Sequence, residues 1–183
     1  MRSTGIALIV LAAAFAVAGC NGEARWLRVP NPDDTGSEDG SPRQEDKAAL
    51  PPFPADRDLL PFDVGGASRN TYFVDAESIN VGADSVIRYT SVVISPSGAR
   101  SVGYEGLDCT SYAYKLYATG RPDGTWSEVK QPEWRPITFT EINRHRIVLY
   151  KDFFCPKKVP VRTPGEAMRA LKSGGHPRAE DSL

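Results

Sequence analysis

The chain has 183 residues, with 22 Lys or Arg against 23 Asp or Glu, which gives a formal net charge of −1 at pH 7. This near-neutral charge argues against a nucleic-acid partner, because nucleic-acid-binding domains carry a clear basic surplus. With only three cysteines and two histidines, no metal cluster and no cofactor is expected. The composition is typical of one folded domain with Pro/Gly-rich tails.

The N-terminal segment has the pattern of an export signal. Arg2 precedes an apolar run, Gly5–Ala18, and residues 3–22 carry no charge. A positive start and an apolar stretch of this length are typical of a signal peptide. An uncleaved anchor is the alternative, because a charge-free run of about 20 residues can span a bilayer. The strongly apolar part is shorter than that, so residues 1–19 are predicted to be a signal peptide.

The end of this segment, Val17-Ala18-Gly19-Cys20, resembles the lipobox of bacterial lipoproteins. The resemblance implies that Cys20 becomes the new N-terminus and carries lipid such as palmitate, so the first expected partner is a membrane. Asn21, rather than Asp, follows the cysteine, which in that class favours the outer membrane. A plain cleaved signal, without lipid, is the alternative.

Residues 20–58 are predicted to be the lipidated cysteine and a disordered tether. Residues 21–58 contain six prolines, and residues 20–58 carry five basic and nine acidic side chains. Low hydrophobicity combined with net charge leaves too little apolar surface to offset the entropy of ordering. We expect the tether to hold a folded domain clear of the membrane. A disordered partner-binding segment is the alternative.

Short apolar stretches separated by turn residues predict a globular α+β domain over residues 59–156. The expected fold is a twisted antiparallel sheet of about five or six strands with one packed helix and a short C-terminal helix. The candidate strands are Leu59–Val64, Tyr72–Asp75, Ser85–Ile94, Ala99–Cys109, Tyr112–Thr119 and Thr125–Val129.

The packed helix is expected near the end of this domain. Thr138 and Glu141 have the spacing of a capping box, and apolar residues follow at helical offsets as far as Phe153. A final strand over Ile147–Phe154 is a serious competitor, because this stretch is rich in residues that favour strands.

Residues 157–183 are predicted to be a basic tail that contains a short helix. Thr163 can cap the helix, Pro164 suits its first position and Glu166 completes a capping box. Gly174-Gly175 would end it. The six basic and three acidic residues of the tail are more typical of solubility than of nucleic-acid contact.

Cys109 and Cys155 remain after lipidation of Cys20. An exported protein with one remaining pair of cysteines is expected to form a disulfide. A reactive pair would have closely spaced cysteines, and the sequence has no Cys-x-x-Cys. Unpaired thiols are the other alternative.

The hairpin around Ser95–Gly98 predicts a strand register. If Ile94 faces Ala99 across this turn, Arg88 faces Glu105 on one largely apolar side of the sheet. A candidate buried ion pair follows, which is either structural or the floor of a polar pocket.

Several aromatic residues form a candidate contact surface. Tyr112 and Tyr114 share one face of their strand, Tyr117 lies on the other, and Trp126 and Trp134 follow. Core and edge packing is the simpler interpretation. The alternative is an exposed aromatic platform for a carbohydrate or a protein.

The residues give no signal of an enzyme. Glu105 and Asp108 fall on opposite faces of a strand, which makes a poor acid/base pair. His145 lies between two arginines, which lowers its pKa, and His176 is expected in a flexible tail. No Gly-x-Ser-x-Gly, phosphate-binding Gly loop or His-Glu-x-x-His is present.

Several short motifs occur in order along the chain: Phe73-Val74-Asp75, Ser78, Arg88-Tyr89-Thr90, Ser95-Pro96-Ser97-Gly98-Ala99, Tyr104-Glu105-Gly106, Cys109 and Phe154-Cys155-Pro156. Together they resemble the CNP1-like family of small lipoprotein-like chains of proteobacteria. The resemblance covers about residues 50–174 and implies no activity and no functional residues. A weaker similarity, to the surface-adhesin protein E type of lipoprotein, is an argument about fold alone.

We therefore expect a non-enzymatic, lipid-anchored cell-envelope protein at the outer membrane. Its domain would face the periplasm and bind an unknown protein or cell-wall partner. A surface-exposed adhesin-like lipoprotein is the first alternative. The second is an accessory to an envelope hydrolase, with a polar pocket at Arg88 and Glu105.

Overall fold

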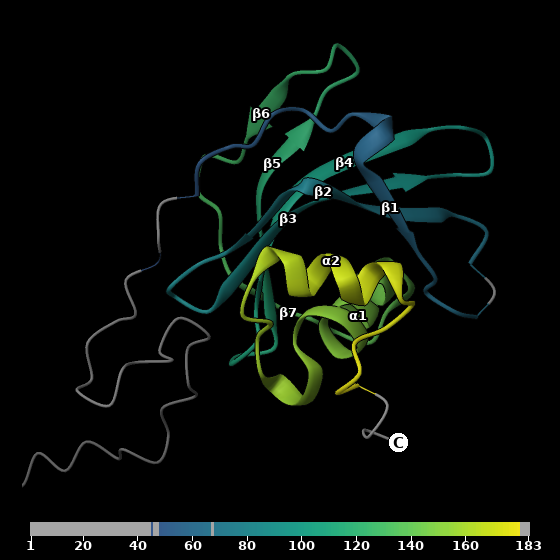
Figure 1. Ribbon diagram of the computed structural model, residues 1–183. Coiled ribbons are helices and arrows are strands. Elements are labelled where there is room, and N and C mark those ends of the chain that lie inside the picture. The colour runs from purple at the N-terminus through teal and green to yellow at the C-terminus, as the bar shows by residue number, and fades with distance from the viewer. Residues whose placement is uncertain (1–44, 46–47, 67, 180–183) are drawn as a thin grey trace, which may run out of the picture.

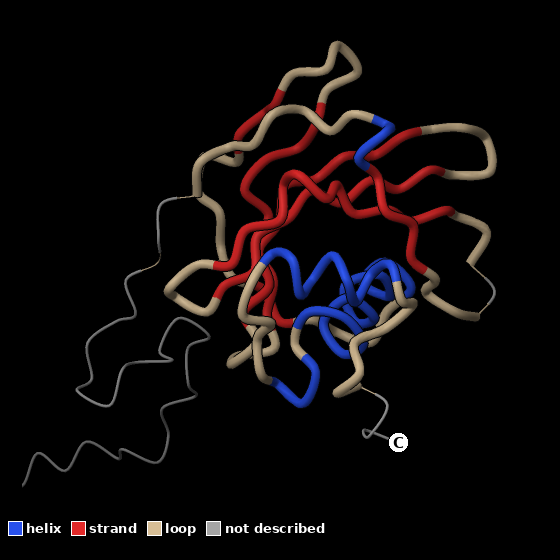
Figure 2. Tube along the Cα trace, viewed as in Figure 1, coloured by secondary structure: helices blue, strands red, loops and turns tan. Residues whose placement is uncertain are grey.

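The computed structural model describes residues 45, 48–66 and 68–179. The predicted signal peptide, Cys20 and the first part of the predicted tether lie outside the described residues. The described chain forms a strongly curved antiparallel sheet, and the principal helices lie together on one of its faces (Figures 1 and 2). The fold is therefore α+β, as predicted.

Within the described residues the sheet has seven strands in the order β1-β2-β3-β4-β5-β6, and β7 pairs with β5. A strand forms at each of the six predicted positions, but β2 continues six residues past the predicted end at Asp75, and β7 was not expected. The strands are β1 (Leu59–Phe62), β2 (Thr71–Val81), β3 (Val86–Ile94), β4 (Arg100–Asp108), β5 (Ala113–Gly120), β6 (Trp126–Glu128) and β7 (Arg135–Pro136).

The predicted packed helix is one helical segment with three parts, η4 (Glu141–Asn143), α1 (Arg144–Val148) and the π-helical η5 (Leu149–Phe154). No strand forms there, so the competing prediction is wrong. The predicted capping box is also wrong. Thr140 precedes η4 without a side-chain cap, and the carboxylate of Glu141 accepts hydrogen bonds from Arg144.

The second predicted helix is α2 (Pro164–Lys172), and its cap is the predicted one. The hydroxyl of Thr163 accepts a hydrogen bond from the backbone N–H of Glu166 at 3.1 Å. The Glu166 carboxylate in turn accepts one from the backbone N–H of Arg162 at 2.7 Å. The first bond satisfies one of the N–H groups that the first turn leaves without a partner, and the second holds Arg162, the residue before the cap, instead of the N–H of Thr163 that a capping box would use. Two short 3₁₀ turns, η3 (Asp56–Asp58) and η6 (Pro156–Lys158), are the other helical elements in the described part of the chain.

The register of the β3–β4 hairpin differs by one residue from the predicted one. The backbone N–H of Gly98 donates to the carbonyl of Ser95, and Gly98 has φ of 82°. This left-handed glycine adds a bulge residue to the turn. Ile94 therefore pairs with Arg100 instead of Ala99.

A one-residue slip moves every side chain of one strand to the other face. Arg88 pairs with Gly106, and Tyr89 pairs with Glu105. Arg88 and Glu105 consequently lie on opposite faces of the sheet, and the predicted ion pair between them does not form.

The main core lies between the sheet and the helices. Central strands contribute Ile87, Tyr89 and Leu107, each of which is completely buried. The helical segment contributes Leu149 and Phe154 to the same cluster. The Tyr89 and Phe154 rings meet edge to face with their centroids 5.3 Å apart, so the central strand and the helical segment form one packed unit.

The predicted disulfide between Cys109 and Cys155 is present, with Cα atoms 5.3 Å apart. It joins the end of β4 to the end of η5, and both cysteines are buried in the main core. The bond therefore fixes the helical segment against the sheet at one end.

The other face of the sheet is covered by the N-terminal residues, which corrects the predicted tether. Leu50 packs with Tyr104 and Tyr117. The ring of Phe53 contacts that of Trp126, with centroids 5.2 Å apart. Residues 48–58 thus belong to the domain, because their apolar side chains complete a second small core.

The predicted basic tail is also part of the domain. Val161, Ala167 and Leu171 are buried in the main core. His176 is only 6% exposed, and its Nε2 lies 2.9 Å from the Glu166 carboxylate. The flexible position predicted for His176 is therefore wrong.

Candidate functional site

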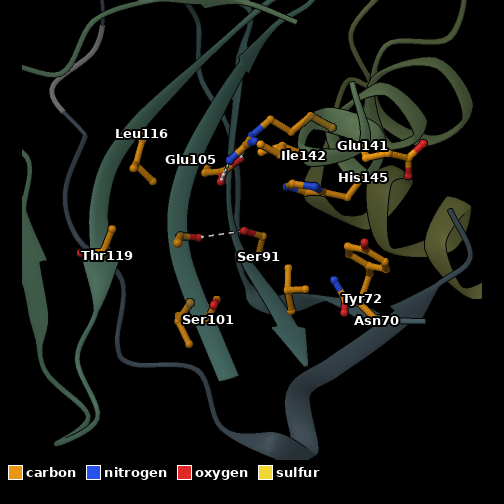
Figure 3. A pocket seen from close by; sticks show the side chains of 14 residues that line it. Asn70, Tyr72, Ser91, Ser101, Glu105, Leu116, Thr119, Glu141, Ile142 and His145 are labelled. Carbon is orange, nitrogen blue, oxygen red and sulfur yellow. Dashed lines mark hydrogen bonds and ion pairs between the residues drawn. The ribbon is translucent and has the colours of Figure 1, made fainter. Parts of the chain in front are cut away.

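A cleft of about 400 Å³ opens between the sheet and the start of the helical segment. Figure 3 shows Leu116, Thr119 and Ser101 on its strand side and Ile142 and His145 on its helical side. The residues that line it are Asn70, Tyr72, Ser91, Val93, Ser101, Val102, Gly103, Glu105, Leu116, Thr119, Glu141, Ile142, His145 and Arg146.

The floor of the cleft is a two-pronged ion pair between Glu105 of β4 and Arg146 of α1. Arg146 donates from Nη2 to Oε1 of Glu105 at 2.5 Å and from Nε to Oε2 at 2.8 Å. The Glu105 side chain is only 3% exposed. A planar guanidinium that meets a carboxylate in this way fixes both groups in one geometry.

Further contacts hold both partners of this pair. The hydroxyl of Tyr89 donates to Oε2 of Glu105 at 3.2 Å. Burial, followed by the nearby charge of Glu105, raises the pKa of Tyr89 well above its ordinary value. Arg146 also donates to Oδ1 of Asn143 at 3.0 Å and lies over the ring of Tyr114 at 4.1 Å. The floor is therefore a rigid polar surface.

His145 forms part of the wall beside this pair. Its ring stacks on that of Tyr72, with centroids 5.7 Å apart and planes 17° apart. Burial lowers the pKa of His145 to about 4; Glu105 acts in the opposite direction, and Arg146 adds to the lowering. The imidazole is therefore neutral near pH 7. The predicted lowering is confirmed, although burial is a larger cause than the neighbouring arginine.

Hydroxyl groups and apolar side chains alternate around the rest of the cleft. Ser101 and Thr119 are exposed at the strand side. Ser91 Oγ is directed along the floor and donates to the carbonyl of Gly103 at 3.4 Å (Figure 3). Ile142, which is 80% exposed, stands at the mouth. The cleft therefore offers hydrogen-bonding groups together with apolar contact surface.

On the opposite face of the sheet, Arg88 is paired with a different carboxylate from the predicted one. Its Nη2 lies 2.6 Å from Oδ2 of Asp84, and both side chains are almost completely buried. The carboxylate of Glu45 lies 3.4 Å from Arg88 and 2.5 Å from Lys115. The polar pocket that was predicted to hold both Arg88 and Glu105 does not exist, so the hydrolase-accessory alternative loses its basis.

The predicted aromatic platform is also wrong. Tyr112 packs edge to face on Tyr150, and Tyr114 lies under Arg146, both on the helical side of the sheet. Trp126 packs with residues of the opposite face, and its Nε1 donates to the carbonyl of Pro51. Trp134 lies under Lys115 at 4.7 Å. These four rings are partly buried in separate contacts, which fits the simpler interpretation of core and edge packing.

Within the described residues, no group of three or more His, Cys, Asp or Glu side chains is placed to hold a metal ion. In the same part of the chain, no helix has the length and apolarity needed to cross a membrane.

Comparison with known protein families matches the CNP1-like family over residues 38–172. The chain belongs to the CNP1-like family. This confirms the family resemblance of its short motifs, and the matched region includes residues 48–58, which pack against the sheet. No curated protein and no solved structure is similar enough to count as a match.

Proposed function

We propose that this CNP1-like protein is a non-enzymatic, lipid-anchored cell-envelope protein whose domain faces the periplasm. We further propose that it binds a protein or cell-wall partner in the cleft between η4–α1 and the sheet. The observation that carries the proposal is the cleft itself. A concave site with apolar lining and a few fixed polar groups is the usual form of a ligand site.

The state of the titratable groups favours recognition over proton transfer. The Glu105 carboxylate accepts hydrogen bonds from Arg146 and Tyr89. His145 has a pKa of about 4 and stays neutral near pH 7. A general acid or base works best when its pKa lies near the working pH. His145 does not meet that condition, and the carboxylate of Glu105 is already held by Arg146 and Tyr89, whereas fixed polar groups suit a binding site.

The chemistry of the cleft suggests the form of the partner. Exposed Asn70, Ser101 and Thr119 supply neutral donors and acceptors. Leu116 and Ile142 supply apolar contact. A neutral, extended chain with alternating polar and apolar groups, such as a peptide or a glycan strand, matches this lining better than a highly charged ligand.

The envelope location rests on the cysteines. The lipobox-like Val17-Ala18-Gly19-Cys20 supports lipidation of Cys20 at an exported N-terminus. Cys109 and Cys155 are bonded to each other, and disulfides persist in oxidising compartments such as the periplasm. All three cysteines therefore suit an exported lipoprotein.

Site-specific photo-cross-linking in intact cells tests the binding proposal. A photoreactive residue replaces Thr119, which lines the cleft, and a matched one replaces Thr125, which is exposed in the β5–β6 turn. Position 119 should yield one defined cross-linked envelope protein or wall fragment that position 125 does not. Equal cross-linked products at both positions, or no product at position 119, would contradict the proposal that the partner binds in the cleft.

The adhesin-like alternative places the same domain outside the cell. Both candidate functions use a lipid anchor and a binding surface, so they differ in the side of the outer membrane that the domain occupies. Access of an added protease to the predicted tether in intact cells separates them.

A further inference from the structure

The cleft continues into a second hollow at its β2 side. This hollow has a volume of about 440 Å³ and shares Asn70 and Tyr72 with the cleft. Its other residues come from β1 and from the connection between β1 and β2, among them Asp63 and Ser68. Because Asn70 is exposed and lines both hollows, they adjoin there, and we call the two together the groove.

The strand register places residues of the groove in a row across one end of the sheet. Tyr72 of β2 pairs with Val93 of β3, and Val93 pairs with Ser101 of β4. Gly103, two positions further along β4, pairs with Thr119 of β5. Figure 3 shows Tyr72 and Thr119 at opposite sides of the cleft. The groove therefore runs across the strands and not along one of them.

The length of this row indicates the length of a ligand that fills it. The groove extends from β1 to β5, which are four neighbouring pairs apart in the sheet. Neighbouring strands lie about 4.8 Å apart, so the path is roughly 19 Å long. An extended peptide rises about 3.3 Å per residue, so about six residues span the path.

The aromatic side chains of the groove are covered, which favours a peptide over a glycan. Among the described residues that line it, the aromatic ones are Phe62, Tyr72 and His145, and all three are buried. Tyr72 and His145 stack on each other, and Phe62 packs edge to face on Phe153. Sugar rings commonly bind by stacking on the open face of an aromatic ring. A glycan would find no such face in the described part of the groove.

Exposed polar side chains along the row can bond to the main chain of a peptide. Asn70, Ser101 and Thr119 are exposed, and each of them has at least one donor and one acceptor. None of the three side chains has a hydrogen-bond partner among the described residues. A peptide presents one N–H and one C=O at almost every residue, so these three side chains can hold it at intervals along the groove.

The second hollow offers a carboxylate to a basic side chain. Asp63 is exposed and is the one charged residue among the described residues that line this hollow. Its carboxylate accepts a hydrogen bond from the N–H of Gly65 at 2.8 Å, and no described cation is paired with it. Arg144 approaches the hollow but is paired with Glu141 at 2.7 Å, and Arg69 does not line it.

The cleft at the other end offers apolar contact. Val93 and Leu116 are half-buried there, and Ile142 is exposed at the mouth. Gly103 keeps the floor clear, because a Cβ added to it would lie 3.3 Å from Oε1 of Glu105 and 3.4 Å from Cδ1 of Leu116. One apolar side chain of a ligand can therefore lie in the cleft.

We propose that the groove binds an extended segment of another protein, about six residues long, with a basic side chain beside Asp63 and an apolar side chain against Leu116 and Ile142. This rests on the partner-binding function proposed above for the cleft. The part of the segment in the cleft is neutral, and its single charge lies in the second hollow.

Selection of hexapeptides from a random library on the full purified chain tests the proposal. The bound peptides are sequenced, and the Kd of the most enriched peptide is measured by fluorescence polarisation. The enriched peptides should carry Lys or Arg towards one end and Leu, Ile or Val towards the other. Absence of this pattern among the bound peptides would overturn the proposal.

Asp63→Asn tests the basic end. The variant loses the charge but keeps an oxygen that can accept from the N–H of Gly65, so the loop should keep its structure. The Kd should rise by about two- to fivefold, which is the range for one exposed ion pair. Glu133→Gln is the matched control, because Glu133 is exposed and lines neither hollow. An unchanged Kd in Asp63→Asn would contradict the basic side chain.

Ile142→Ser tests the apolar end. Ile142 is exposed, so the variant should fold normally and raise the Kd through lost contact alone. Val159→Ser is the matched control, because Val159 is also an exposed apolar residue but lines neither hollow. The same Kd in both variants would contradict the apolar contact.

The cross-link from position 119 separates failure of this proposal from failure of the function proposed for the cleft. A defined product that contains a glycan, together with no enriched hexapeptide, would overturn the peptide and leave the cleft as a binding site. No product from position 119 would overturn binding in the cleft, and the peptide with it.

Discussion

Glu105 and Arg146 join the middle of the sheet to the first turn of α1 through two hydrogen bonds of 2.5 and 2.8 Å. The two residues are 41 positions apart in the chain. Their side chains are 3% and 11% exposed. Because both charges are removed from water, each depends on the other, and the pair fixes the depth and shape of the cleft above it.

Removal of one member of this pair should therefore destabilise the protein more than removal of both. Arg146→Met leaves a buried carboxylate without its partner, which costs about 3–5 kcal/mol of unfolding free energy. The double variant Glu105→Gln, Arg146→Met should recover part of that loss. Urea unfolding measures all three free energies.

Arg144→Met is the matched control, because its partner Glu141 is exposed. Surface ion pairs contribute little to stability, so this variant should unfold close to the wild type. A neutral Arg146→Met would contradict the buried pair.

The buried His145 should make stability fall in mild acid. Its folded-state pKa of about 4 lies below the ordinary value of 6.5, so the unfolded chain takes up the proton first. Its contribution is complete above about pH 6.5 and is lost as the pH falls towards 4, by roughly 3 kcal/mol in all. Urea unfolding across this range measures the slope.

His145→Phe keeps an aromatic ring against Tyr72 but has no group that titrates. The variant should lose the part of the slope between pH 6.5 and 4, while carboxylates elsewhere still act. An identical slope in the wild type and in His145→Phe would show that His145 is not buried in neutral form.

The hairpin shows where interpretation of the sequence reaches its limit. Alternation of residues predicted β3 and β4, and Ser95-Pro96-Ser97-Gly98 predicted the turn between them. Alternation cannot decide, however, whether Gly98 is a turn residue or a bulge. That single residue sets the register, so the same pattern that predicted the strands placed Arg88 and Glu105 wrongly on one face.

The candidate site was harder to predict than the fold because its central pair joins distant segments. Glu105 stood out as a charge in an apolar strand. Arg146 was visible only as one of two arginines flanking His145, and local spacing does not show which strand a helix crosses. With Gly98 treated as a bulge, the predicted register would have placed Tyr89 opposite Glu105, and the positively charged partner of Glu105 would have had to come from outside β3.

The N-terminal residues 48–58 should be required for full stability. Phe53 packs on Trp126 and approaches Gly120, where an added Cβ would lie 2.9 Å from the phenylalanine ring. Phe53→Ala removes this half-buried ring, which should cost about 1–2 kcal/mol. The exposed neighbouring variant Pro52→Ala is the control. Equal stability of the two variants in urea would contradict this packing and would support the predicted tether instead.

The disulfide should resist reduction in the folded protein, because Cys109 and Cys155 are 0% and 1% exposed. Native protein and urea-unfolded protein are treated with the same mild reductant and then alkylated, and their masses are measured. The native protein should keep the disulfide, and the unfolded protein should lose it. The double variant Cys109→Ala, Cys155→Ala opens a loop of 46 residues. In the chain-entropy account it loses about 4 kcal/mol of stability. Rapid reduction without denaturant would contradict the buried position.

The central claim is that the domain is lipid-anchored and lies on the periplasmic side of the outer membrane. Trypsin treatment of intact cells tests it most directly. Trypsin can cleave after Arg28 and Arg43 in the predicted tether, and peptides from residues 21–44 are quantified by mass spectrometry. We predict protection in intact cells and cleavage once the outer membrane is permeabilised, and membrane attachment that is lost in Cys20→Ser. Release of these peptides from intact cells would contradict the periplasmic location and favour the adhesin-like alternative.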